Sequence, residues 1–109
     1  MMASVELDGK TIIDWPTFHQ ACKSAFGFPD FYGDNMDAWV DCMSYLRDDE
    51  GMTRFKLQEN DVLTITILNT AALRTAAPDI LDDLQFCIEA INDRYTDYGE
   101  KAALALKLA

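Results

Sequence analysis

The stretch that most constrains the fold is Val62–Leu68, VLTITIL, which is dense in β-branched side chains and carries no charge. β-branched residues favour extended backbone, and a run this apolar fits a strand buried in a sheet. Strands of this kind usually belong to parallel sheets whose connections are helices. We therefore expect helices on both sides of this segment along the chain.

The flanking sequence predicts those helices and two further strands. Asp14 and Pro78 are helix-start signals, whereas Gly27 and Pro29 end a helix. Strands are expected over 4–8, 62–68 and 102–108, helices over 15–26, 36–46 and 79–95, and a helical turn over 69–75. The order β-α-α-β-α-β predicts an α/β fold: a small three-stranded, mainly parallel sheet packed by helices. The polar residues 47–61 predict a long surface loop, and 109 residues suit a single domain, 1–109.

The charge balance restricts the partners. The chain has 9 Lys and Arg against 19 Asp and Glu, a net charge of −10. This disfavours direct binding to nucleic acid or to an anionic membrane and favours a basic protein partner. The three cysteines, Cys22, Cys42 and Cys87, lack CxxC spacing and predict buried reduced thiols. With no apolar leader segment at the N-terminus, the predicted location is cytoplasmic.

The predicted helix over 36–46 has two unlike faces. At about 100° per residue, one side collects the apolar residues Met36, Trp39, Val40, Met43 and Leu46. The other side collects Asp34, Asp37 and Asp41, with Tyr45 on the same face. From residue 30 to 50, seven acids stand against Arg47 alone, a net charge of −6. The sequence therefore predicts a row of carboxylates opposite a buried face.

Helix capping accounts for only part of this row. Asp34 or Asn35 would cap the helix, and Asp37 would complement its dipole. Asp41 lies in mid-helix, where aspartate is a poor helix former and meets a like charge four residues earlier. Because capping does not require it, Asp41 is the first candidate for partner binding.

Aromatic side chains accompany the carboxylates. Of Phe31 and Tyr32, one is expected to pack against the core and the other to stand beside the acids as an interface anchor. In the helix over 79–95, a core stripe (Ile80, Leu84, Cys87, Ile88, Ile91 and Tyr95) leaves Asp82, Phe86, Glu89 and Asp93 on the far side. Phe86 could extend the acidic surface.

No enzymatic constellation is recognisable. His19 and Cys22 lie three residues apart, but no third ligand or orienting group accompanies them, so a core cysteine beside a partly exposed histidine is the preferred interpretation. Asp37 and Asp41 on one exposed face lack the burial that would separate their pKa values. The glycines form no phosphate loop, and Asp34–Asp41 does not match a calcium loop. We expect a non-enzyme without cofactor or metal.

Three segments carry a family resemblance: Leu7–Gly9, Phe18–Gln20 and PDFYGDNMDAWVDC at 29–42. They resemble the barstar family, intracellular inhibitors of barnase-type ribonucleases. The run YGDNMDA followed by Asp41 and Cys42 is the specific part. The resemblance is tight over about residues 5–46 and recovers around 84–90.

The resemblance implies how such a protein would bind. Asp41 would enter a ribonuclease active site where a substrate phosphate sits, so that carboxylates replace phosphates. Further contact positions match Phe31, Gly33, Asn35, Asp37 and Glu89; Tyr32 and Tyr45 join them as the aromatic neighbours of the acids. The alternative left open is a non-inhibitory module that binds another basic protein, or a mimic of double-stranded nucleic acid.

Four features depart from the family pattern. Phe31 lacks the hydroxyl of the usual tyrosine, and Tyr45 occupies a usually small position. The pair Trp39-Val40 reverses the usual aliphatic-then-tryptophan order, which is expected to turn the tryptophan toward the core. The loop 47–61 is longer than is typical. Partner choice is expected to depend on these places.

Overall fold

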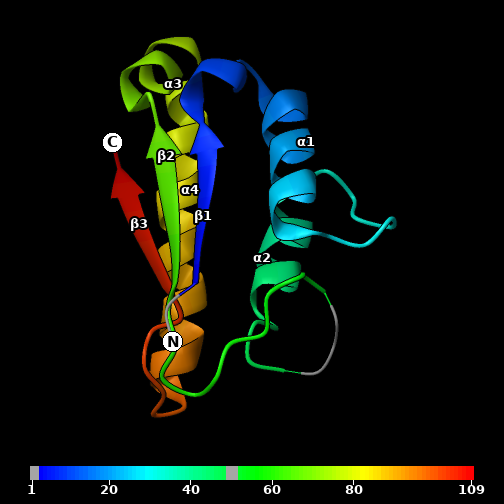
Figure 1. The fold of residues 1–109 in the computed structure, drawn as a ribbon, viewed down its shortest axis with the longest axis vertical. Coiled ribbons are helices and arrows are strands. Elements are labelled where there is room, and N and C mark those ends of the chain that lie inside the picture. The colour runs from blue at the N-terminus through cyan, green and yellow to red at the C-terminus, as the bar shows by residue number, and fades with distance from the viewer. Residues whose placement is uncertain (1–2, 49–51) are drawn as a thin grey trace.

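The computed structural model describes residues 3–48 and 52–109. The strands are β1 (Ala3–Asp8), β2 (Leu63–Leu68) and β3 (Leu104–Leu108), and the helices are η1 (Gly9–Thr11), α1 (Trp15–Phe26), α2 (Met36–Met43), α3 (Thr70–Ala76) and α4 (Pro78–Asp97). The three strands form a parallel sheet in the order β1-β2-β3 (Figure 1). The predicted α/β fold with a three-stranded parallel sheet is confirmed.

The sheet buries one face and exposes the other. In register, Val5 pairs with Ile65 and Ile65 with Leu106, and these side chains point toward the helices. On the opposite face, Glu6 lies beside Thr66. The alternation of threonine and isoleucine within LTITIL explains why β2 tolerates an uncovered face, although parallel sheets are usually covered on both.

Strand β3 begins two residues later than predicted, at Leu104. The reason is a side chain: Asn92 of α4 accepts hydrogen bonds at Oδ1 from the backbone N–H groups of Ala103 and Leu104, at 3.1 and 3.0 Å. Asn92 also donates from Nδ2 to the Leu104 carbonyl oxygen at 3.0 Å. The entry into β3 is therefore tied to α4 as well as to β2, whose Leu63 N–H donates to the Ala103 carbonyl oxygen at 2.9 Å.

The core fills the space between the sheet and the helices. Its largest fully buried side chains include Trp39, Phe18 and Phe26. The ring of Phe26 meets that of Trp39 edge-on at 6.2 Å. Trp39 on the buried side of α2 is as predicted, and it anchors this short helix to α1.

The segment 47–61 is only partly the surface loop that was predicted; Asp49, Glu50 and Gly51 lie outside the described residues. Leu57 is buried, and its N–H donates to the Leu46 carbonyl oxygen at 2.7 Å. Arg54 donates from Nε to the Ala25 carbonyl oxygen at 2.8 Å. Polar composition indicated exposure here, but long-range hydrogen bonds hold Arg54 and Leu57 against the body of the domain.

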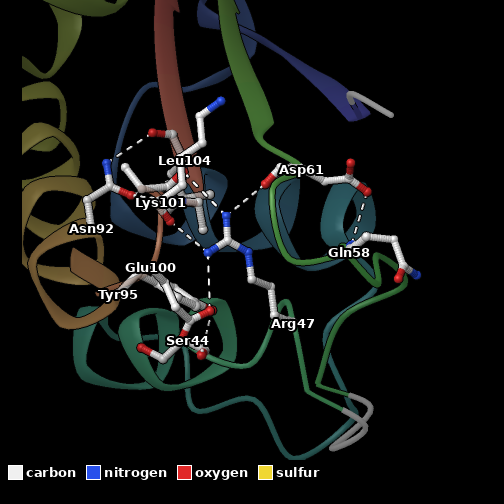
Figure 2. A network of polar contacts seen from close by, with 11 residues as sticks. Ser44, Arg47, Gln58, Asp61, Asn92, Tyr95, Glu100, Lys101 and Leu104 are labelled. Carbon is white, nitrogen blue, oxygen red and sulfur yellow. Dashed lines mark hydrogen bonds and ion pairs between the residues drawn. The ribbon is translucent and has the colours of Figure 1, made fainter. Parts of the chain in front are cut away.

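Arg47 is the largest departure from the surface-loop prediction. Its side chain is only 6% exposed. Figure 2 shows the guanidinium reaching across the fold: Nη1 donates to the Lys101 carbonyl oxygen at 2.6 Å, and Nη2 to the Asp61 carbonyl oxygen at 2.9 Å. Nη1 also pairs with Glu100 at 3.4 Å, and the group lies 4.9 Å above the Tyr95 ring. One side chain thus joins the end of α2 to the segments entering β2 and β3.

Replacing this arginine tests its importance. Arg47→Met should lower the free energy of unfolding by about 1–3 kcal/mol, because the Lys101 and Asp61 carbonyl oxygens lose their charged donor. Urea unfolding measures the change. Arg74→Met is the matched control, since Arg74 is exposed on α3, and it should change stability by less than about 0.5 kcal/mol. Equal losses from the two substitutions would contradict the role of Arg47.

Candidate protein-binding site

The acidic surface starts at a sharp turn before α2. Asn35 caps the helix: its Oδ1 accepts from the Ala38 N–H at 2.8 Å, while its Nδ2 donates to the Gly33 carbonyl oxygen at 3.0 Å. Asp34 does not cap; its backbone is left-handed, with φ of 51°. Aspartate tolerates this region better than most residues. Of the two predicted caps, Asn35 is therefore the one used, and the Asp34 carboxylate stays on the surface.

Asp37 and Asp41 project from the exposed side of α2. Together with Met36 and Val40 they line a groove of about 470 Å³ between α2 and α4. Among the described residues, neither carboxylate has a hydrogen-bond or ion-pair partner. Two like charges one turn apart destabilise a helix, and Asp41 is also near the negative end of the α2 dipole. The arrangement can receive cationic side chains.

The aromatic pair before the turn divides as expected. Phe31 is 73% exposed, whereas Tyr32 is 7% exposed and belongs to the core. The Tyr32 hydroxyl and His19 Nδ1 are hydrogen-bonded at 2.6 Å. Tyr32 therefore supports the site from below, and Phe31 is the aromatic side chain available to a partner.

His19 is buried rather than partly exposed, which corrects the sequence-based interpretation. Its ring stacks on Trp15 at 5.7 Å and meets Phe18 at 5.3 Å. Burial lowers the pKa of His19, and the nearby Asp34 carboxylate offsets part of that effect. The histidine is a neutral core residue that joins α1 to the loop carrying Phe31.

The remaining candidates lie at different distances from the groove. Gly33 and Asn35 are exposed at the turn before α2, and Tyr45 is 40% exposed just beyond the end of the helix. Glu89 is exposed on α4 but lines a different hollow, beside Leu104 and Leu106 of β3. The structure brings the α2 residues together and leaves Glu89 outside their groove.

The α4 wall of the groove was largely missed. It consists of Phe86, Cys87, Ala90 and Arg94; the sequence associated only Phe86, 70% exposed, with the acidic surface, and it placed Cys87 in the core. The helical pattern of α4 indicates which side is apolar, but it does not reveal that α2 packs beside this edge. No sequence pattern indicated that Arg94 would lie in the acidic groove.

The cysteine thiols in and beneath the groove have raised pKa values. Burial raises the pKa of the Cys22 thiol to about 12, with a small opposing effect from the Trp39 side chain. Burial likewise raises the pKa values of Cys42 and Cys87, so all three thiols are protonated. Within residues 3–48 and 52–109, no cluster of His, Cys, Asp or Glu suits a metal ion. None of the described helices has the length and hydrophobicity needed to cross a membrane.

The chain is an α/β domain with an acidic helix face beside an exposed aromatic ring. Comparison with known proteins places it in a family. The family described as Barstar (barnase inhibitor) matches residues 2–107, so the chain belongs to the barstar family. It is also 28% identical over 94 residues to a Bacillus subtilis (strain 168) protein named "Putative ribonuclease inhibitor YrdF"; the match covers 86% of this chain and 94% of that protein.

The buried histidine predicts a pH dependence of stability. Because its pKa in the folded state lies below the ordinary 6.5, the unfolded state binds the proton more readily. The contribution of the neutral His19 to the free energy of unfolding is complete above about pH 6.5. It is lost as the pH falls toward the pKa of His19 in the folded state. His19 is the only histidine, so His19→Gln should flatten the fall in unfolding free energy between about pH 7 and 5.5.

Urea unfolding at the two pH values measures this slope. Asp34→Asn is a second variant. It lacks the carboxylate that favours protonation of His19, so its unfolding free energy should fall more steeply with decreasing pH than that of the wild type. Equal slopes in the wild type and His19→Gln would contradict the assignment.

Proposed function

We propose that this protein inhibits a barnase-type ribonuclease by covering its active site with the surface of α2 and the preceding loop. The single observation that carries this is the groove in which Asp37 and Asp41 have no ion-pair partner among the described residues. The family membership and the similarity to a protein named as a ribonuclease inhibitor support it. We further propose a cytoplasmic single-domain protein, 1–109, that has no enzymatic activity and protects its host from a basic nuclease toxin.

The mechanism follows from charge and shape. A ribonuclease cleft presents cationic groups where it binds substrate phosphates. The Asp41 carboxylate, projecting from a helix fixed by Trp39, would occupy such a position without needing to move. Phe31 adds apolar area beside it, and apolar anchors with flanking charges are typical of tight interfaces. The cleft is then closed to RNA, and the ribonuclease cannot cleave the inhibitor, because a carboxylate is not a phosphodiester.

The direct test is an inhibition titration. Purified wild-type protein is added to barnase, and to further barnase-type ribonucleases, while cleavage of a fluorogenic RNA is followed. Loss of cleavage at a one-to-one ratio supports the proposal. Binding without loss of cleavage would favour a non-inhibitory module, and no binding to any of these enzymes would overturn the proposal.

Asp41→Asn should weaken binding to the ribonuclease by about a hundredfold or more, because truncating one partner of a buried charge pair costs at least 2–5 kcal/mol. Asp82→Asn makes the same chemical change on α4, where Asp82 is exposed, and should change affinity by less than about threefold. Calorimetric titration compares the two. Similar losses of affinity in the two variants would contradict the proposed role of Asp41 in the interface.

The association rate should fall with salt. Exposed carboxylates on a chain of net charge −10 attract a basic partner over long range, and ions screen that attraction. Stopped-flow mixing between about 0.05 and 0.5 M NaCl should show a decrease of at least tenfold. A rate independent of salt would exclude steering by this surface.

A further inference from the structure

A second hollow adjoins the acidic groove and differs from it in chemistry. It has a volume of about 440 Å³ and lies where the end of α2 meets the end of α4. Its lining comprises Ser44, Tyr45, Arg47, Asp48, Arg94, Tyr95, Tyr98 and Glu100. Arg94 lines both this hollow and the acidic groove. The two hollows therefore share Arg94 as a common wall residue.

Arg94 has unused hydrogen-bonding capacity. Its Nη1 donates to Ser44 Oγ at 3.0 Å, and Ser44 Oγ in turn donates to the Val40 carbonyl oxygen at 2.6 Å. No carboxylate pairs with Arg94 within the part of the chain that is described. A guanidinium carries five N–H donors, so most remain available. The serine holds the side chain in place while its charge faces outward.

The rest of the hollow adds two phenol hydroxyls. Arg47 does not contribute a free donor, because its Nε–H, unpaired among the described residues, is itself buried. Tyr45 and Tyr98, the latter 85% exposed, carry phenol hydroxyls at the rim. Of the two acids, Glu100 is already paired with Arg47 at 3.4 Å, and Asp48 is exposed. Within the described residues, the Arg94 guanidinium is thus an unpaired cation beside hydroxyl donors, on a protein that is acidic elsewhere.

Resting on the proposed function, we propose that this hollow binds an acidic side chain of the ribonuclease, whose carboxylate pairs with Arg94 and accepts from the tyrosine hydroxyls. The inhibitor surface then changes sign along its length: carboxylates at Asp37 and Asp41, and a cation at Arg94. A partner must match both signs in the right order. Such a pattern sets the orientation of binding and rejects uniformly basic proteins.

Arg94 also has a structural effect that the test must separate. It lies beside Ser44 at the C-terminal end of α2, where a cation stabilises the helix dipole by a modest amount. That effect predicts a small loss of stability in the free protein and no loss of affinity. General electrostatics predicts tighter binding to a basic partner when a positive charge is removed. The proposal predicts weaker binding, so the sign of the change decides.

The experiment titrates four variants against barnase by calorimetry. Arg94→Gln should bind about tenfold more weakly than wild type, the lower end of measured interfacial charge pairs. Arg74→Gln, the same change on α3, should bind as wild type within about twofold. Asp48→Asn should bind as tightly as wild type or more tightly. Unchanged or tighter binding by Arg94→Gln overturns the proposal, as does weaker binding by Asp48→Asn, which would indicate a cationic occupant.

Asp41→Asn in the same series separates the two levels of inference. If Asp41→Asn binds weakly and Arg94→Gln binds normally, the hollow is not a subsite and the proposed function stands. If Asp41→Asn binds normally, the proposed inhibitory surface is wrong whatever Arg94 does. A wild-type chain that binds neither barnase nor the related ribonucleases overturns both.

Discussion

The contacts of Arg47 hold together parts of the chain that no helix or strand connects. Its guanidinium bonds to backbone carbonyl oxygens before β2 and before β3, and it lies on the Tyr95 ring of α4. Tyr95 in turn donates to the Ser44 carbonyl oxygen at 2.8 Å. The end of α2 therefore has a defined place relative to α4, and the groove between these helices depends on that place. The one basic residue of the acidic segment is also directed inward, which leaves the surface carboxylates unneutralised.

Local signals made the elements predictable. The β-branched run of β2, Asp14 at the start of α1 and Pro78 at the start of α4 each act within a few residues, and the structure has each element where they indicate. The burial of Trp39 followed from helical phase in the same way. The choice between Asp34 and Asn35 as cap did not, because both residue types cap equally well and only the backbone turn at Asp34 decides between them.

Long-range packing explains what the sequence could not show. Arg47 looked like an ordinary loop residue because its acceptors are 14 or more positions away. His19 looked half-exposed because its partner, Tyr32, comes from the next loop. Nothing in the sequence indicated that Arg94 lies near the acidic residues, because that proximity arises only from the packing of α2 beside α4. The acidic face of α2 could be recognised from one helix alone, whereas its opposing wall needed the tertiary structure.

The rates at which the three cysteine thiols react with an alkylating reagent would report on the helices that carry them. Cys22, Cys42 and Cys87 lie in α1, α2 and α4, one to each helix that builds or supports the groove. Cys22 and Cys42 are buried, so an alkylating reagent can reach them only when their helix opens, whereas Cys87 lines the groove. The order in which Cys22 and Cys42 react therefore ranks α1 and α2 by local stability. Protection of Cys42 by a bound protein would report closure over α2 without any change to the surface residues themselves.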